Sequence, residues 1–393
     1  MTIKLQRLIK LDASSQTSCF LWGPRQTGKS TLLKDLFSEA KYYDLLLSEV
    51  YSRLLSSPSL IRQECEALGL TGETQTLPII IDEVQKLPFL LDEVHWLIEN
   101  RALRFILCGS SPRKLKRSGG HLLGGRAVRY QLFPFVFPEI PDFSLLRALN
   151  HGLLPRHYLA EEPGPLLEAY VGDYLKEEIM AEAATRNIPA FSRFLEVAAL
   201  SNGEIVNFQN IASECGVTAP TVKGYFQILE DTLLGVWIRA FRKQIKRRVI
   251  LSPKFYFFDV GVVAHLARRG IIRENSELFG KAFEHFLILE VMAHARYSGL
   301  NYPVQYWRTA SQIEVDLILG QGETAVEIKA TALAQDHHLK GLRAFREEHR
   351  AKCLLVSQDP HPRKTADGIL ILPWQDFLGR LWAGDLIDGR NLL

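Results

Sequence analysis

Residues 23–30, Gly-Pro-Arg-Gln-Thr-Gly-Lys-Ser, limit the possible folds of this chain more than any other segment, because they fit the pattern G-x-x-x-x-G-K-[ST]. An apolar strand, Cys19–Trp22, is expected before them and a helix, Thr31–Phe37, after them. Backbone N–H groups of such a loop bind phosphate oxygens at a helix N-terminus, so the motif needs this strand–loop–helix context. The sequence therefore predicts an α/β nucleotide-binding domain in the amino-terminal part of the chain.

Each part of this loop has a predicted role. Lys29 brings positive charge to the β- and γ-phosphates, and Ser30 offers a hydroxyl to Mg²⁺. The glycines let the backbone wrap the phosphates closely. The residues expected to bind the nucleotide are Gly23, Pro24, Arg25, Gln26, Thr27, Gly28, Lys29, Ser30 and Thr31, with Asp82 and Ser110 from later segments.

Two later apolar segments end in polar residues. Residues 77–81 are followed by Asp82 and Glu83, an arrangement that resembles a Walker B segment. Asp82 would then hold the water shell of Mg²⁺, and Glu83 would orient or deprotonate the attacking water. The strand 104–108 is followed by Gly-Ser-Ser, which makes Ser110 a candidate sensor of hydrolysis. The alternatives are a strand that ends in a solvated acidic turn and a serine that only forms a turn.

A group of basic residues follows this third strand. Arginines in such a position are candidates for a finger that stabilises transition-state charge, within one subunit or between subunits. Arg126 is the residue that we assign to this role, with Arg129 as its alternative. Solvated surface charge explains the cluster equally well. Its members are Arg113, Lys114, Lys116, Arg117, Arg126 and Arg129.

The middle of the chain contains a helix–turn–helix pattern at residues 207–231, in which Ala212, Gly216 and Val222 occupy the small, turn and core positions. Residues 233–241 then alternate like the strand of a wing. If this unit binds nucleic acid, Thr221 and Lys223 meet a groove. The residues that would contact phosphates are Arg242, Lys243, Lys246, Arg247 and Arg248. The alternative is a unit that only packs one domain against the next.

The carboxyl-terminal region predicts a compact α/β domain. The expected helices are 278–298 and 336–350, and the expected strands are 304–308, 313–319, 324–329 and 352–356. Strand periodicity places Ile313, Val315, Leu317 and Leu319 on one face, and Glu314 with Asp316 on the other. Glu327 and Lys329 share a face of the next strand, so Asp316, Glu327 and Lys329 fit the pattern D-x(10)-E-x-K.

Metal-dependent cleavage of a phosphodiester needs two or three carboxylates around Mg²⁺ or Mn²⁺ and a cation near the water or the scissile phosphate. Lys329 would be the cation, and Glu284 on the preceding helix the further acid, with Glu290 in reserve. The predicted catalytic residues are Glu284, Asp316, Glu327 and Lys329, and the predicted metal ligands are Ser30, Asp82, Glu284, Asp316 and Glu327. An exposed salt-bridged hairpin, or a nuclease-like fold that binds without cutting, would carry the same pattern.

Composition excludes several classes of protein. With 47% apolar and 23% charged residues the chain is neither disordered nor collagen-like, and a net charge of +3 does not by itself indicate nucleic-acid binding. The five cysteines are too scattered for a disulfide framework or a zinc site. No apolar run reaches the ~18 residues of a membrane span. We expect a cytoplasmic protein with domains at 1–143, 144–272 and 273–393.

These motifs together resemble a bacterial and archaeal family of ATP-binding proteins, in which an AAA-type ATPase is fused to a carboxyl-terminal domain similar to PD-(D/E)XK nucleases. The segments that carry the resemblance are 23–30, 82–88, 108–111, 125–126, 132–135, 256–261, 280–284, 306–309, 314–316 and 326–329. It implies ATP and Mg²⁺ at Lys29, Ser30, Asp82 and Glu83, and a homo-oligomer, such as a ring. Cys108 stands where relatives tend to carry threonine, whereas Ser110 is intact.

Two functions follow from these predictions. In the first, ATP hydrolysis rearranges or translocates DNA through the winged helix while the last domain cleaves it. In the second, ATP occupancy is a switch or drives remodelling, and the nuclease-like domain only binds nucleic acid or protein. In the first function the partner of this protein would be DNA that is double-stranded, branched or broken at its ends.

Overall fold

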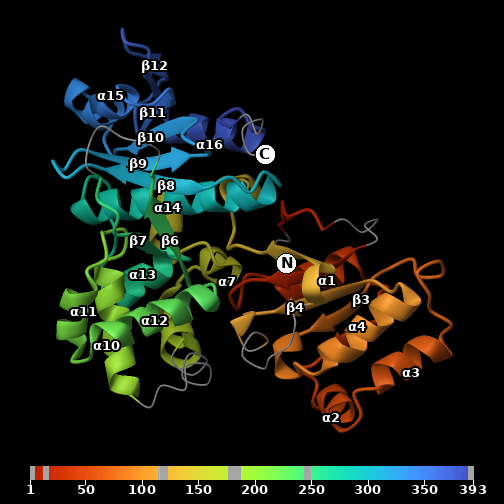
Figure 1. Ribbon diagram of the computed structural model, residues 1–393. Helices are drawn as coiled ribbons and strands as arrows, with labels where there is room; N and C mark the ends of the chain where they lie inside the picture. The colour runs from red at the N-terminus through yellow and green to blue at the C-terminus, as the bar shows by residue number, and fades with distance from the viewer. Residues whose placement is uncertain are drawn as a thin grey trace. The chain divides into compact units, whose positions relative to one another are not determined.

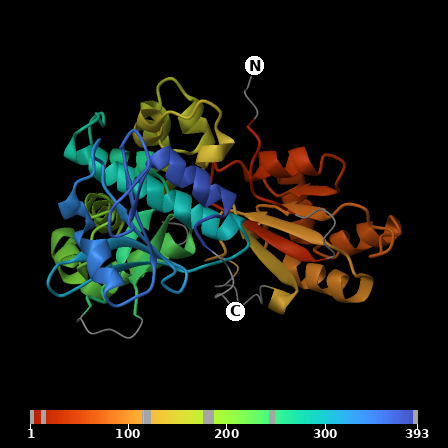
Figure 2. The same ribbon diagram turned by 90° about the horizontal axis from the view of Figure 1, so that it is seen from above.

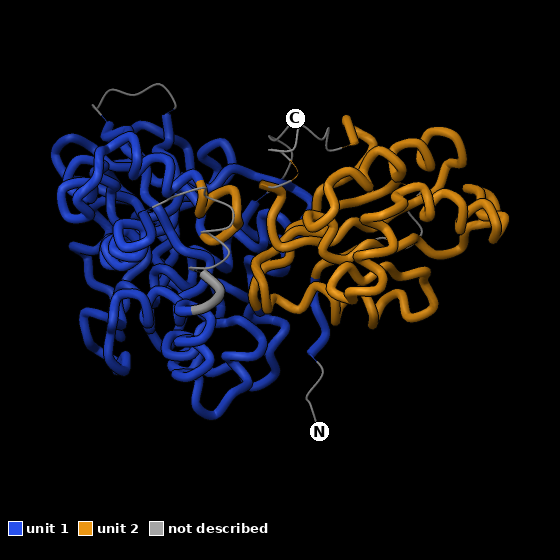
Figure 3. The backbone as a smooth tube through the Cα atoms, turned by 90° about the horizontal axis from the view of Figure 1, so that it is seen from below, with its two compact units in different colours: residues 1–8, 135–227, 235–393 blue, residues 9–134, 228–234 orange. Residues whose placement is uncertain are grey.

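The computed structural model describes residues 5–11, 17–113, 115, 123–175, 187–242 and 249–387. The chain divides into two compact units, which Figure 3 colours separately. The amino-terminal unit comprises residues 9–134 and 228–234, and the carboxyl-terminal unit comprises residues 1–8, 135–227 and 235–393. The predicted boundary at 272–273 therefore falls inside one compact unit.

The amino-terminal unit is built on a five-stranded sheet of order β2-β3-β4-β1-β5 in which every pair of neighbours is parallel. Its strands are β1 (Ser18–Trp22), β2 (Tyr42–Asp44), β3 (Ile79–Asp82), β4 (Phe105–Gly109) and β5 (Ala127–Gln131). Every residue of β1, β3 and β4 is buried, as expected for a parallel sheet covered on both faces. The strands predicted before the three polar motifs are thus confirmed, with ends shifted by one or two residues.

Helices cover this sheet, and their apolar residues complete one core with the strands. They are α1 (Lys29–Leu36), α2 (Ser48–Ser56), α3 (Leu60–Ala67) and α4 (Leu90–Arg101), with short 3₁₀ turns η1 (Val84–Lys86) and η2 (Leu123–Gly125). Helix α1 begins at Lys29, two residues earlier than predicted, because Gly28 in the left-handed region ends the loop. The loop therefore leads directly into the helix N-terminus.

The carboxyl-terminal unit contains an eight-stranded mixed sheet of order β12-β13-β11-β10-β9-β8-β6-β7. The strands are β6 (Gly235–Ala240), β7 (Lys254–Phe257), β8 (Val304–Arg308), β9 (Glu314–Leu319), β10 (Thr324–Ile328), β11 (Lys352–Ser357), β12 (Arg363–Lys364) and β13 (Leu370–Pro373). Strand β6 pairs with both β7 and β8, so strands from the middle of the chain continue the sheet of the last region.

Two helices cover one face of this sheet and a third covers the other. Helices α14 (Glu277–Tyr297) and α16 (Trp374–Ala383) lie side by side and share a core with the strands (Figure 2). Helix α15 (Lys340–Arg346) packs on the opposite face, where Phe345 lies in a second core. Strand β13 and helix α16 were not predicted from the sequence.

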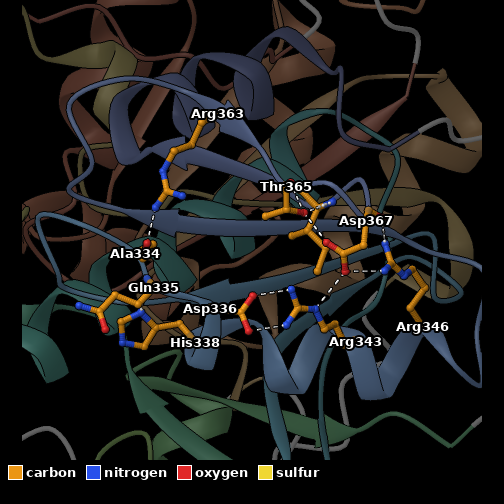
Figure 4. A network of polar contacts seen from close by, with 10 residues as sticks. Ala334, Gln335, Asp336, His338, Arg343, Arg346, Arg363, Thr365 and Asp367 are labelled. Atoms are coloured by element: carbon orange, nitrogen blue, oxygen red, sulfur yellow. Dashed lines mark hydrogen bonds and ion pairs between the residues drawn. The ribbon is translucent and has the colours of Figure 1, made fainter.

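The predicted helix 336–350 is wrong in its extent. Residues 336–339 form a 3₁₀ turn, η5 (Asp336–Leu339), and α15 then ends at Arg346. A polar network at this point ties the two elements to the loop before β13 (Figure 4). Arg343 donates to both oxygens of Asp336 and to Asp367, and Arg346 also reaches Asp367.

The predicted alternation along β9 is also wrong. Gln305 of β8 is paired with Ile318, but Trp307 is paired with Val315, so β9 contains one more residue than β8 between these pairs. Such a bulge changes which face the following side chains occupy. Val315 accordingly packs in one core with Ile318, whereas Leu317 and Leu319 pack in the other. The bulge lies at the position of Asp316.

A helical segment precedes and flanks this sheet. Its helices are α6 (Leu145–His151), α7 (Pro155–Leu159), α8 (Gly164–Ala169), α10 (Ile188–Leu200), α11 (Phe208–Cys215), α12 (Ala219–Asp231) and α13 (Val260–Leu266), with the short turns η3 (Phe137–Glu139) and η4 (Tyr170–Leu175). Asn207 caps α11 through its side chain, and Gly216 ends it in the left-handed region. The expected helix, turn and helix at 207–231 are therefore present, followed by the β6–β7 hairpin.

None of the helices in the described part of the chain has the length and apolar composition that crossing a membrane requires.

Candidate nucleotide-binding and phosphodiester sites

The loop between β1 and α1 is shaped by two residues in the left-handed region, Gln26 with φ 63° and Gly28 with φ 91°. A side chain at Gly23 would bring a Cβ within 2.5 Å of the carbonyl oxygen of Leu132, so glycine is required there. The hydroxyl of Thr27 donates to the carbonyl of Pro24 at 2.8 Å and closes the turn. These contacts give the compact loop that the motif predicts.

Lys29 is buried and its ammonium lies against this loop. Nζ donates to the carbonyl oxygens of Gly23 at 2.7 Å and Pro24 at 2.9 Å. Ser30 is half-buried beside it, and Arg25 and Thr31 are exposed. The positive charge and the helix N-terminus are therefore adjacent, which is the arrangement that binds phosphate.

Asp82, at the end of β3, is buried and fixed by two donors. Its Oδ2 accepts a hydrogen bond of 2.5 Å from the phenol of Tyr42, and its Oδ1 accepts one of 3.0 Å from the backbone of Glu83. Burial and the contact with Asp82 raise the pKa of Tyr42, so the phenol remains a donor. Tyr42 lies on the neighbouring strand β2, and no local signal in the sequence indicates its role.

Glu83 follows in the left-handed region, with φ 59°, which is uncommon for a residue other than glycine and occurs at functional sites. Burial raises the pKa of its carboxyl group, and the nearby Lys29 charge opposes that rise. The side-chain amide of Gln85 donates to Oε2 of Glu83. A carboxylate with a raised pKa suits the role of general base for an attacking water.

The end of β4 lies beside these residues. Ser110 is buried, and its hydroxyl accepts a hydrogen bond of 3.1 Å from the same amide of Gln85. The next residues contact the last turn of α12. The Ser111 hydroxyl donates to the backbone carbonyl of Asp231 at 3.1 Å, and the Arg113 guanidinium forms an ion pair with the Asp231 carboxylate at 2.7 Å. The ends of β1, β3 and β4 thus bring the predicted nucleotide residues to one edge of a parallel sheet, where such folds bind ligands.

The two arginine-finger candidates lie just before the start of β5 and within it. Arg126 is exposed and pairs with Glu99 of α4, and Arg129 is exposed on β5. Lys114, Lys116 and Arg117 lie outside the described residues. The assignment of a finger to Arg126 stays a prediction.

The four residues predicted for phosphodiester chemistry line one pocket of ≈ 530 Å³ in the carboxyl-terminal unit. These residues come from α14, from the bulge of β9 and from the end of β10. They are Glu284, Asp316, Glu327 and Lys329, and the pocket is completed by Gly203, Glu204, Ile205, Lys254, Arg308 and Glu314.

Lys329 bridges two of the acids. Its Nζ lies 2.6 Å from Oε1 of Glu327 and 3.7 Å from Oδ2 of Asp316. Asp316 Oδ2 also accepts a hydrogen bond of 2.7 Å from the backbone of Ile328, which takes the place of a ladder bond next to the bulge. The bulge therefore aims the Asp316 carboxylate at the adjacent strand and at Lys329.

Lys254 is a second cation in the pocket, and it was not predicted from the sequence. It lies on β7 and is 5% exposed, and its Nζ is 2.5 Å from Oε1 of Glu314 and 3.9 Å from Oε1 of Glu284. Tyr256 on the same strand donates to Glu284 at 2.7 Å, and Arg308 pairs with Glu314 at 3.0 Å. A lysine on an apolar strand far along the chain gives no spacing signal that could have found it.

Burial and mutual repulsion shape the charges of this pocket. Burial, with the neighbouring Asp316 charge, raises the pKa of Glu284 and of Glu327. Burial works against the charged form of Lys254 and Lys329, but the surrounding carboxylates outweigh it and raise the pKa of both amines. The two lysines therefore remain charged.

Carboxylates are suitable ligands for Mg²⁺ or Mn²⁺, and Oε2 of Glu327 is buried with no hydrogen-bond partner in the part of the chain that the structure describes. Within the described ranges, however, no three histidine, cysteine, aspartate or glutamate side chains are grouped as a metal ion requires. The lysines pair with the carboxylates in the present arrangement. The metal ligands assigned from the sequence thus stay predictions.

Glu290, the reserve acid, lies elsewhere. Its two oxygens accept hydrogen bonds from the backbone of Phe137 at 2.8 Å and from the indole of Trp382 at 2.9 Å. It is buried among α14, α16 and the segment before α6. Glu290 therefore joins elements of the fold and has no place in the pocket.

The predicted nucleic-acid contacts are only partly described. Thr221 is half-buried and its hydroxyl shares a hydrogen bond of 2.9 Å with that of Thr218. Lys223 is exposed and lies over the ring of Phe208. Lys243, Lys246, Arg247 and Arg248 lie outside the described residues, whereas Arg242 is exposed.

A family model described as an AAA domain matches residues 15–141, which contain β1 to β5 and the complete phosphate-binding edge. This part of the chain is an AAA-type P-loop ATPase domain. Two further models match later parts of the chain: domain of unknown function DUF8612 at residues 143–271 and domain of unknown function DUF4143 at residues 279–377.

Two curated relatives match this chain over more residues than the AAA domain contains. An uncharacterized protein of Mycobacterium tuberculosis is 26% identical over 325 residues, which cover 79% of this chain and 70% of that protein. An uncharacterized protein of Mycobacterium bovis matches with the same identity and coverage, 26% over 325 residues.

Two solved structures are also similar. A Walker-type ATPase of Pyrococcus abyssi is 17% identical, covers 64% of this chain and 90% of its own, and gives a TM-score of 0.39. A signal transduction ATPase with numerous domains from Pyrococcus horikoshii, which has a tetratricopeptide repeat sensor, is 14% identical. The match covers 72% of this chain and 46% of that protein and gives a TM-score of 0.21. The assignment of the AAA domain rests on the family model and on the loop geometry.

Proposed function

We propose that ATP hydrolysis in the AAA domain drives metal-dependent cleavage of DNA phosphodiester bonds in the carboxyl-terminal pocket. One observation carries the proposal: Glu284, Asp316, Glu327 and Lys329, chosen from sequence spacing, line a single pocket. They come from one helix and two strands, and a salt-bridged hairpin alone would not bring the helix residue Glu284 to the others.

The side chains of the pocket are of the type that this chemistry uses, and the carboxylates would have to regroup around the cation, because among the described residues no three of them are grouped as a metal ion requires. A divalent cation held by the carboxylates would polarise the scissile phosphate and lower the pKa of a bound water. Asp316 is held in place by the Ile328 backbone and Glu284 by the Tyr256 phenol, so both carboxylates are oriented before a substrate arrives. Lys329, 35% exposed, can release Glu327 and place its ammonium against a phosphate.

DNA would reach the pocket through the helix–turn–helix. Lys223 of α12 is exposed, and Arg242 begins the basic segment after β6. Phosphate contacts of this kind make binding strongly dependent on salt. In the same proposal the chain forms a homo-oligomer, such as a ring, in which Arg126 exchanges Glu99 for the nucleotide of a neighbouring copy.

A second candidate is a nucleotide switch, in which the same pocket binds nucleic acid or protein without cutting. The observation that favours it is Lys254, a buried cation that already compensates Glu314 and Glu284. Lys329 and Arg308 are paired as well, so three cations already offset part of the charge of the five acids that line the pocket.

The test is cleavage of linear, single-stranded and four-way-junction DNA with Mg²⁺ or Mn²⁺, with and without ATP. The variants are Asp316→Asn and Lys29→Ala, and Asp376→Asn, an exposed acid on α16, is the matched control. The proposal predicts cutting by the wild type and the control, none by Asp316→Asn, and loss of the ATP-dependent part in Lys29→Ala. Retained ATP turnover with no cutting of any substrate would favour the switch.

A further inference from the structure

Gln85 connects the two strand ends that hold the hydrolytic residues. It lies in the turn η1, directly after β3, and is only 4% exposed. Its Nε2 donates to Oε2 of Glu83 and, at 3.1 Å, to the hydroxyl of Ser110 at the end of β4. One amide group therefore contacts both the candidate general base and the candidate phosphate sensor.

The carbonyl oxygen of this amide is closely surrounded by other atoms. Oε1 of Gln85 is buried and has no hydrogen-bond partner among the described residues. A Cβ at Gly109 would lie 2.2 Å from this oxygen and 2.7 Å from the ring of Trp22. Glycine at position 109 therefore leaves the space that the Gln85 side chain occupies. Leaving a buried carbonyl oxygen without a partner is unfavourable, and such exceptions occur where another requirement fixes the group.

The group is fixed by the two hydrogen bonds that Nε2 of Gln85 donates. Strands β3 and β4 are parallel neighbours, so the residues that follow them leave the sheet at the same edge, and Gln85 bridges them there. Glu83 itself holds an uncommon backbone conformation with φ 59°. A single donor shared by Glu83 and Ser110 fixes both side chains relative to each other.

We propose that Gln85 is a positioning residue for ATP hydrolysis: its amide holds the carboxylate of Glu83 in register with the hydroxyl of Ser110. When the γ-phosphate leaves, a movement of the Ser110 hydroxyl would then shift the Glu83 carboxylate through the Gln85 amide. The inference rests on ATP hydrolysis by the AAA domain and is independent of what the carboxyl-terminal pocket does.

The test compares Gln85→Met and Gln85→Ala with wild type in ATP turnover and in the binding of a non-hydrolysable ATP analogue. Methionine keeps the volume of the side chain and removes its amide, so the fold is retained even if alanine leaves a cavity. We expect kcat to fall roughly 10- to 100-fold, as misplaced catalytic groups do, while the Kd of the analogue changes less than about threefold.

Gln75 provides the matched control. It is a buried glutamine of the same unit, and its side chain bonds the backbone of Arg104 at 2.7 and 2.9 Å, at the start of β4. Gln75→Met should lower Tm and leave kcat unchanged.

Ser110→Ala completes a double-mutant cycle. If the amide acts by joining the two residues, the fall in kcat of Gln85→Met combined with Ser110→Ala is smaller than the product of the single effects. If the wild type hydrolyses ATP and kcat is unchanged in Gln85→Met, this inference alone is overturned. The same holds if the effects of Gln85→Met and Ser110→Ala on kcat simply multiply in the double variant. No turnover by the wild type contradicts the proposed function and this inference together.

Discussion

The phenol of Tyr42 donates a hydrogen bond of 2.5 Å to Oδ2 of Asp82. This contact crosses from β2 to β3 and leaves the carboxylate of Asp82 with one fixed orientation at the phosphate-binding edge. Asp82, predicted to hold the water shell of Mg²⁺, is therefore oriented by Tyr42, a residue that belongs to no motif.

Tyr42→Phe should weaken the use of MgATP. Removing the hydroxyl leaves a buried carboxylate oxygen with one donor fewer, and hydrogen bonds to charged groups contribute about 1.5–3 kcal/mol. We expect kcat/KM for MgATP to fall roughly 10-fold, which corresponds to about 1.4 kcal/mol. Tyr43→Phe is the control, because Tyr43 loses a similar bond, to Glu64 at 2.8 Å, outside the site. An equal loss of kcat/KM in both variants would refute a specific role for Tyr42.

Lys254→Met should destabilise the carboxyl-terminal unit. The substitution leaves Glu314 and Glu284 facing each other without the buried ammonium, and removing one partner of a buried ion pair costs about 3–5 kcal/mol. The free energy of unfolding in denaturant measures the loss. Adding Glu314→Gln should recover part of it. Lys281→Met, which removes an exposed pair with Glu204, should change stability by less than about 1 kcal/mol.

Glu290 should make stability fall as the pH rises. Burial raises the pKa of its carboxyl group from 4.5 to about 8. The folded protein therefore holds this proton more tightly than the unfolded chain, so the contribution is fully favourable below the unfolded pKa and is lost as the pH rises toward about 8.

The slope from one such group is about 1.4 kcal/mol per pH unit within that window. Glu290→Gln removes the titration, so its Tm should decline less than that of the wild type between pH 5 and pH 8. Glu277→Gln, an exposed acid on the same helix, should follow the wild type. Parallel curves for wild type and Glu290→Gln would contradict the assignment.

Local motifs predicted the AAA domain well. The loop 23–30, Asp82 and Glu83, and the turn at Ser110 each follow an apolar strand, and parallel strands bring such ends to one edge. Tyr42 and Gln85 could not be predicted, because their roles depend on contacts across strands and not on spacing along the chain.

The carboxyl-terminal pocket was predicted in part. Glu284, Asp316, Glu327 and Lys329 lie together, although the alternation used to orient Asp316 fails at the bulge of β9. A bulge adds one residue to one strand only, and nothing in the hydrophobic pattern of residues 313–319 marks it. Lys254 was missed because β7 joins this sheet from a distant part of the chain.

The measurement that tests the central claim most directly is steady-state ATP turnover by the wild type and by Glu83→Gln, with analogue binding measured in parallel. The account predicts that wild type hydrolyses ATP with Mg²⁺, and that Glu83→Gln binds the nucleotide equally well but turns it over at least about 100-fold more slowly, because the general base is lost. Equal turnover by the two proteins, or tight nucleotide binding without turnover by the wild type, would contradict it.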